Sequence, residues 1–277
     1  MIAGCKNHLW VARLSIHLCL LQFAISQDHW ETAVYAGDIW SYVVPESELP
    51  VDWSSIGFDD SSWLTGEGGF GYGDGDDGTE ITPAVSVYLR RIFTVADAAS
   101  LVSAIIHADY DDGFVAYLNG TEIGRSSNLG DPGAFIPFDE TTSSDHEAQL
   151  YQGGYPDAHS LDSEQLASIL TEGDNVLAVQ AHNVGTNSSD MSSNFFLSFG
   201  IADGSTYYGP TPEWFQAPFT FTESSLPIVI IDTFGEEIHS DPRITAHMGI
   251  IDSGSGINHM SDPFNGYDGQ ISIEVRG

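Results

Sequence analysis

The sequence predicts an all-β protein built on a two-sheet sandwich with one short helix. Its apolar runs are short and are separated by turns rich in glycine, aspartate and serine, which is the pattern of all-β sandwiches. Hydrophobic residues make up 42% of the chain and aromatic residues 12%, so the chain can bury a core despite its acidity. Asn119-Gly120 directly follows the apolar run Phe114–Leu118 and predicts a tight hairpin turn at that point.

Six segments are predicted as strands of this sandwich. They are Asp38–Val44, Val85–Phe93, Leu101–Ala108, Phe114–Leu118, Asn175–His182 and Phe195–Ile201. We expect Leu101–Ile123 to form a hairpin that is broken near the acidic turn Asp109–Gly113. Asn175–His182 is nearly all apolar and is expected to be a buried central strand.

A single helix is predicted between two of these strands. Asp162 can cap its first turn, and Gln165, three residues on, completes a capping box. Leu166, Ile169 and Leu170 would form its apolar face. The helix is therefore expected in the residues that follow Asp162.

The first 26 residues are predicted to be a signal peptide. Lys6 and Arg13 precede the apolar run Leu14–Ser26, and Ala24-Ile25-Ser26 offers the small residues that a signal peptidase reads. The run is too short and too interrupted by polar residues to span a bilayer. Both cysteines lie in this leader, so the remaining chain has no disulfide. We therefore expect a secreted or cell-surface protein without membrane insertion after cleavage.

The chain is strongly acidic, with 7 Lys and Arg against 40 Asp and Glu and a formal net charge of −33. Without the leader, five arginines and no lysine face all 40 acids, a formal charge of −35. Binding to nucleic acid or to an anionic membrane surface needs many Lys and Arg, so both are excluded as expected functions. A saline habitat and several calcium sites would each account for the excess of acid, and the composition does not choose between them.

Three short motifs follow one another in a fixed order. They are Phe58-Asp59-Asp60-Ser61-Ser62-Trp63, the glycine-acid loop Gly69–Asp76, and Asp111–Gly120. In this order they resemble the galactose-binding-like β-sandwich, or jelly-roll, modules of secreted bacterial carbohydrate-active and cell-surface proteins. The resemblance covers most of Trp30–Ile201 and implies a polysaccharide or cell-surface glycan as the partner.

A second resemblance concerns the last 52 residues, after a Pro-, Gly- and aromatic-rich stretch. Leu226–Thr233 and the apolar segments after it are similar to the opening β-segment of the spore-coat CotH kinase-like family. The predicted organisation is therefore a leader (1–26), the sandwich (27–204), a linker (205–225) and a partial β-rich start of a CotH-like domain (226–277). We expect the parent chain to continue past Gly277 into downstream domains.

Two acidic loops are the candidate metal sites. Calcium takes about six to eight oxygen ligands from carboxylates and carbonyls, and glycines let a loop turn its carbonyls inward. The candidate ligands are Asp74, Asp76, Asp109, Asp111 and Asp112. Aspartate and glycine also make ordinary turns, so a structural calcium and a plain turn both remain open.

The candidate ligand-binding residues are aromatic and polar side chains in or beside loops. Aromatic rings can stack on the apolar faces of sugars while polar groups fix the hydroxyls. These residues are Tyr110, Tyr151, Tyr155, His182, Asn183 and Asn194.

Gly66–Gly71 matches the spacing G-x-G-x-x-G, but no helix or lysine follows it and the acids after it would repel phosphate. We expect a glycine turn there instead of a nucleotide site. No catalytic residue is assigned, because chance alone brings some carboxylates to glycosidase distance in so acidic a chain. The predicted function is a secreted, non-catalytic carbohydrate-binding module of a larger protein. The alternatives are a structural spacer without a ligand and the N-terminal part of an extracellular CotH-like kinase.

Overall fold

The computed structural model describes residues 27–73, 75, 77–218, 222–236, 238–254 and 256–276. These residues form two compact units, one up to Phe215 and the other from Gln216 onward. The first unit is an antiparallel jelly-roll β-sandwich with one α-helix, so the predicted fold class is confirmed. In the part of the chain that is described, no helix is long and apolar enough to cross a membrane.

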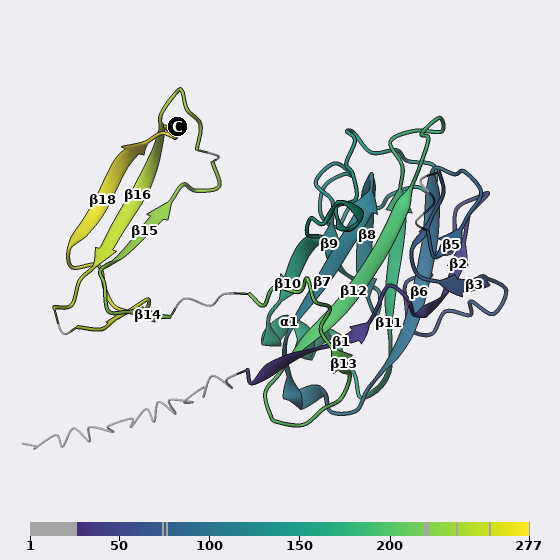
Figure 1. Ribbon diagram of the computed structural model, residues 1–277, viewed down its shortest axis with the longest axis horizontal. Helices are drawn as coiled ribbons and strands as arrows, with labels where there is room; N and C mark the ends of the chain where they lie inside the picture. The colour runs from purple at the N-terminus through teal and green to yellow at the C-terminus, as the bar shows by residue number, and fades with distance from the viewer. Residues whose placement is uncertain are drawn as a thin grey trace, which may run out of the picture. The chain divides into compact units, whose positions relative to one another are not determined.

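The sandwich consists of two facing sheets (Figure 1). One sheet has the order β10 (Asp157–Leu161), β7 (Leu101–Asp111), β12 (Ser192–Ile201), β1 (His29–Val34) and β13 (Gly209–Pro210). The other has the order β3 (Leu64–Glu67), β2 (Ile39–Val43), β6 (Ser86–Val95), β11 (Gly173–His182), β8 (Gly113–Leu118) and β9 (Thr121–Arg125). The short strands β4 (Phe70–Gly71) and β5 (Thr79–Glu80) pair beside them.

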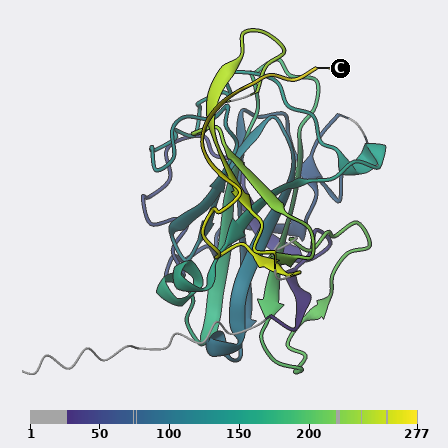
Figure 2. The same ribbon diagram turned by 90° about the vertical axis from the view of Figure 1, so that its left-hand side faces the viewer.

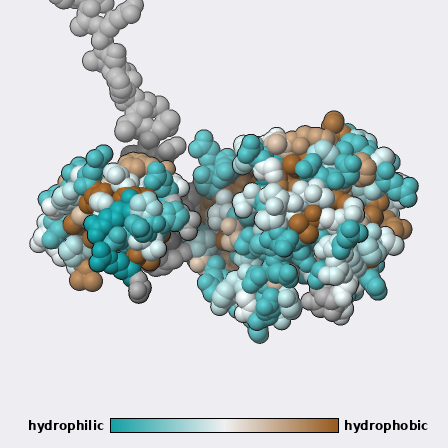
Figure 3. Space-filling view, turned by 90° about the horizontal axis from the view of Figure 1, so that it is seen from above, coloured by the Kyte–Doolittle hydropathy of each residue, from teal (hydrophilic) through white to brown (hydrophobic). Residues whose placement is uncertain are grey.

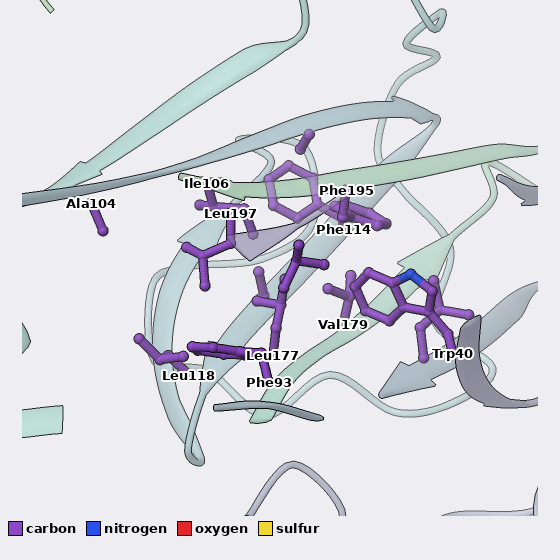
Figure 4. Packing of buried hydrophobic residues seen from close by; sticks show 14 of the residues in the cluster. Trp40, Phe93, Ala104, Ile106, Phe114, Leu118, Leu177, Val179, Phe195 and Leu197 are labelled. Atoms are coloured by element: carbon purple, nitrogen blue, oxygen red, sulfur yellow. The ribbon is translucent and has the colours of Figure 1, made fainter. Parts of the chain in front are cut away.

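The core lies between the two sheets, where alternate side chains of facing strands meet (Figure 4). Phe93 from β6, Phe114 from β8 and Leu197 from β12 are among its buried members. Strand β11 lies between β6 and β8 and is buried along nearly its whole length, as predicted for a central strand. A strand covered on both faces reads as a continuous apolar run, which explains why its sequence alternates so little.

Helix α1 (Ser163–Ile169) begins where the sequence predicts it. The Asp162 carboxylate accepts the Gln165 amide at 2.9 Å, and the Gln165 side chain accepts the Asp162 amide at 2.9 Å. This is the predicted capping box. The helix lies at one end of the sandwich strands (Figure 2) and buries Leu166.

The predicted hairpin over Leu101–Ile123 is only partly right. The turn at Asn119-Gly120, with φ of 50° and 87°, joins β8 to β9 as expected. The chain before it does not pair with β8: strand β7 belongs to the opposite sheet, where it pairs with β10 and β12. Asp112 is thus the corner at which the chain passes from one sheet to the other.

The first half of the segment predicted as a linker lies on the sandwich. Strand β13 pairs with β1, and the Tyr207 and Tyr208 amides each donate to the Glu31 carboxylate at 2.8 Å. The rings of Trp214 and Phe215 pack against the sheet through contacts with His107, Phe196 and Trp30. Contacts with the sandwich therefore extend up to Phe215.

The second unit is a small β structure. Strands β15 (Ile228–Asp232), β16 (Ile244–Ile251) and β18 (Tyr267–Ile273) form a three-stranded antiparallel sheet. Strands β14 (Glu223–Ser224) and β17 (Asn258–His259) form a separate pair. Ile228, Ala246 and Ile251 are its buried apolar residues.

Candidate functional site

The motif Phe58–Trp63 is a turn that neutralises a buried arginine. The side chain of Arg90 on β6 is 0% exposed, and its Nε donates to the Asp60 carboxylate at 2.9 Å. Its guanidinium also donates to the backbone carbonyls of Trp53 and Ser55 and lies 5.2 Å from the centre of the Phe58 ring. A buried charge is tolerated only when it is paired in this way, so the motif supports the fold.

Glycines in and just before the glycine-acid loop pack closely against neighbouring backbone. A Cβ on Gly71 would lie 1.9 Å from the Met191 carbonyl oxygen, and one on Gly68 would lie 1.9 Å from that of Ala36. Any side chain at either position would displace the neighbouring backbone. Asp74 and Asp76, the first pair of predicted metal ligands, lie outside the described residues.

Most of the other predicted site residues gather at one end of the sandwich, where β7, β8, β11 and β12 meet. The strand register places His182 beside Gly113, and Asn194 beside Asp109. We call Asp109, Asp111 and Asp112 the aspartate cluster. They come from the end of β7 and the corner after it, and all are buried.

Two members of the aspartate cluster bind backbone amides. The Asp112 carboxylate accepts the amides of His146 at 2.9 Å and Val184 at 2.7 Å. The Asp109 carboxylate accepts those of Gln149 at 2.6 Å and Leu150 at 3.1 Å. Burial raises the pKa of Asp109, and these amide bonds partly offset the rise. Both side chains thus fix the long connection after β9 to the end of the sandwich. Asp112 also fixes the loop after β11 there.

Asp111 is the exception in the aspartate cluster. Burial raises its pKa to about 8, and the adjacent Asp112 carboxyl, with Asp190 and Glu147, adds to the rise. It is thus a carboxyl whose negative charge is poorly compensated. Within the described residues, no group of three or more His, Cys, Asp or Glu side chains is arranged to hold a metal ion.

Three of the predicted ligand-binding residues are buried beneath the loops. The Tyr110 hydroxyl donates to Asp157 at 2.8 Å, and its ring stacks on His146 at 4.1 Å. His182 lies with Nδ1 2.8 Å from the Glu140 carbonyl, and burial lowers its pKa to about 4. Asn183 donates to the Tyr72 hydroxyl and to the Asp190 carbonyl, each at 2.9 Å. These side chains support the loops from inside.

The remaining predicted residues lie nearer the surface. Tyr151 is 61% exposed and Tyr155 is 59% exposed, and both follow the amides that bind Asp109. Asn194 is half-buried on β12. The two tyrosines are therefore the predicted aromatic side chains that a ligand could reach.

A hollow that the sequence did not predict lies over the connection after β9. Its volume is about 490 Å³, within the usual range for small-molecule pockets. We call it the Phe135 hollow; its lining includes Phe135, Asn128, Asp131, Glu140 and the hydroxyl residues Ser127, Thr141 and Ser143. Phe135 is 64% exposed, so an aromatic face stands beside carboxylate, amide and hydroxyl groups. On the face of the molecule shown in Figure 3, hydrophobic side chains lie singly or in small groups among hydrophilic ones.

An ion pair shapes the rim of the Phe135 hollow. Arg125 binds the Glu122 carboxylate through two nitrogens, at 2.7 and 3.0 Å. The same guanidinium donates to the carbonyls of Leu129 and Ala134 at 2.8 Å, and Glu122 accepts the Gly133 amide at 3.0 Å. The loop that carries Phe135 is thus held by a planar, bidentate pair.

No family model and no curated protein matches the chain. Solved structures that it resembles include a β-glucuronidase of Bacteroides uniformis, with 13% identity over 79% of this chain and 22% of that chain and a TM-score of 0.38. A β-glucuronidase from glycoside hydrolase family 2 matches with 14% identity over 91% of this chain and 27% of that chain, at a TM-score of 0.41. A Bifidobacterium dentium β-glucuronidase complexed with coumarin-3-O-glucuronide matches with 12% identity over 90% and 42%, also at 0.41. This chain therefore spans less than half the length of each of these structures.

Proposed function

We propose that the sandwich is a non-catalytic module that binds carbohydrate, as part of a polysaccharide or a cell-surface glycan. The observation that carries this proposal is the Phe135 hollow, where an exposed ring stands beside convergent polar side chains. A sugar ring presents an apolar face for stacking and hydroxyls around its edge, so it needs this combination of groups. A structural spacer would need neither the ring nor the polar lining.

Tyr151 and Tyr155 offer two further exposed rings on a separate loop. Asp109 fixes the backbone at the start of that loop, so neither ring lies on an untethered segment. A ring held in place loses less conformational freedom on binding. We therefore include both tyrosines in the proposed glycan-binding surface.

The test is a polysaccharide panel applied to the full chain, followed by isothermal titration with oligomers of whichever glycan binds. Phe135→Ala should weaken binding by about tenfold, which corresponds to about 1.4 kcal/mol. The matched control is Phe234→Ala, which removes a similarly exposed ring from the second unit and should leave binding unchanged. Equal effects of the two variants would show that the glycan does not bind in the Phe135 hollow, and a folded protein that binds no glycan would favour the spacer.

Calcium remains a proposal for the aspartate cluster, with Asp111 as its best candidate ligand. Asp109 and Asp112 already accept two amides each, whereas burial and neighbouring carboxyls disfavour the ionised form of Asp111. A bound cation would stabilise the ionised form of Asp111 and strengthen the loops around it. Thermal unfolding with calcium and with EDTA tests this, and an unchanged midpoint in both would exclude a structural ion.

Secretion, the absence of catalysis and the CotH-like character of residues 226–277 are proposals that rest on the sequence. N-terminal sequencing of protein from the culture medium tests the cleavage after Ser26. The kinase alternative requires a reading frame that continues past Gly277 into a lysine-containing core, and a stop codon there would exclude it.

A further inference from the structure

We propose that the Phe135 hollow takes an amino-sugar residue that carries a free ammonium group. This inference rests on the proposed carbohydrate binding and specifies its ligand class. The basis for it is the charge of the residues that line the hollow. Asp131 and Glu140 contribute carboxylates, and none of the lining residues is lysine, arginine or histidine. A positively charged ligand therefore gains attraction there, whereas a uronic acid or a sulfated sugar is repelled.

The nearest arginine offsets these carboxylates only in part, because it attracts Asp131 but is already paired with Glu122. Arg125 is held by Glu122 and by two backbone carbonyls, and its side chain is 4% exposed. Its positive charge is thus already paired behind the rim, in the contacts that position the loop. A ligand carboxylate in the hollow would meet no exposed guanidinium.

The histidine behind the hollow does not supply a positive charge either. His182 is buried beneath Glu140, and burial keeps its pKa near 4. The imidazole is therefore neutral in mildly acidic as well as neutral solution. The lining keeps its net negative character over this whole range.

The remaining groups suit the rest of an amino sugar. The exposed Phe135 ring can stack on the apolar face of the pyranose and also attracts a nearby cation through its π-face. Ser127 and Thr141 in the lining carry hydroxyls, which can exchange hydrogen bonds with the hydroxyls and the ammonium group of an amino sugar.

The experiment compares oligomers of glucosamine, N-acetylglucosamine, glucose and galacturonic acid. Each is titrated into the full chain in mildly acidic buffer at about 0.15 M salt, where long-range attraction is screened beyond about 8 Å. Glucosamine oligomers should bind at least about tenfold more tightly than the neutral ones. Galacturonic acid oligomers should bind most weakly.

Variants separate the Phe135 hollow from the general acidity of the chain. Asp131→Asn with Glu140→Gln should abolish the preference for glucosamine, so that glucosamine and glucose oligomers bind with similar affinity. The matched control is Glu46→Gln with Asp52→Asn, which removes two exposed carboxylates elsewhere on the sandwich and should keep the preference.

A preference that survives in the Asp131 and Glu140 variant would overturn the inference, because the whole surface would then be its source. Neutral oligomers that bind through Phe135, without any preference for glucosamine, would overturn the inference and leave carbohydrate binding intact. If no oligomer binds to the folded chain, the proposed function fails, and the ligand class fails with it.

Discussion

The aspartate cluster and the Phe135 hollow are both acidic, but their carboxylates are used differently. Asp109 and Asp112 are buried and accept backbone amides from distant loops. Asp131 and Glu140 instead line an open hollow beside an exposed ring. In a chain with 40 acids, the presence of carboxylates says little about a site. What distinguishes the two regions is whether the protein itself already satisfies them.

The largest difference should appear on removing Asp112. Asp112→Ala leaves the part-buried amides of His146 and Val184 without their acceptor, so the free energy of unfolding should fall by about 3 kcal/mol. Urea denaturation measures this. Asp131→Ala, the matched change in the hollow, should alter stability by no more than about 0.5 kcal/mol. If the two substitutions lowered the free energy of unfolding equally, the distinction between the two regions would be wrong.

A pH series tests Asp111. A folded-state pKa raised to about 8 means that the folded protein holds this proton more tightly than the unfolded chain. The resulting stabilisation is complete at low pH and is lost as pH rises through about 8, with a limiting slope of about 1.4 kcal/mol per pH unit. Asp111→Asn should flatten the decline between about pH 4 and about pH 8. A variant that declines as steeply as the parent would assign the loss to another group.

The buried histidines act in the opposite direction. Burial lowers the pKa of both His107 and His182 to about 4. The stability that they contribute is present above their usual pKa of about 6.5 and is lost as pH falls through about 4. His182→Gln should reduce the loss of stability on acidification, as followed by thermal unfolding at several pH values. His29→Gln is the control, because His29 is only half-buried and its pKa is raised by its hydrogen bond to Glu31.

The smallest effects on stability are expected in the exposed aromatic residues. Tyr151→Ala combined with Tyr155→Ala should change the free energy of unfolding by about 0.5 kcal/mol or less, because both rings are already in solvent. Any loss of glycan affinity in this variant then reports on contact with the ligand. A large loss of stability would show instead that the rings support the loop.

The strands could be predicted where a short stretch of residues is enough to identify the strand or the turn. Continuous apolar character marks β11, and the Asn119-Gly120 pair marks the turn between β8 and β9. Strands β1 and β10 escaped prediction because they are short and mix polar with apolar residues. The mistaken pairing of β7 with β8 has a related cause: a corner between sheets and a hairpin turn use the same residue types.

The site was less predictable, because its partners are distant in sequence. Asp112 was identified as an acidic loop residue, but its amide partners at His146 and Val184 lie 34 and 72 residues away. Nothing in the sequence pairs them. Phe135 lies in an irregular connection without a repeating pattern, so no periodicity marked it as exposed or placed it beside Glu140. The same limit applies to Asp60 and Arg90, 30 residues apart.

Strand β1 has a consequence for the order in which the protein can be made. It is the first strand described, yet both of its partners, β12 and β13, are formed by residues 192–201 and 209–210. During synthesis its hydrogen-bonding edges stay unpaired until almost the whole sandwich has been translated. The five-stranded sheet therefore closes late. A nascent chain with this topology cannot complete its five-stranded sheet before residues 192–201 and 209–210 have been made.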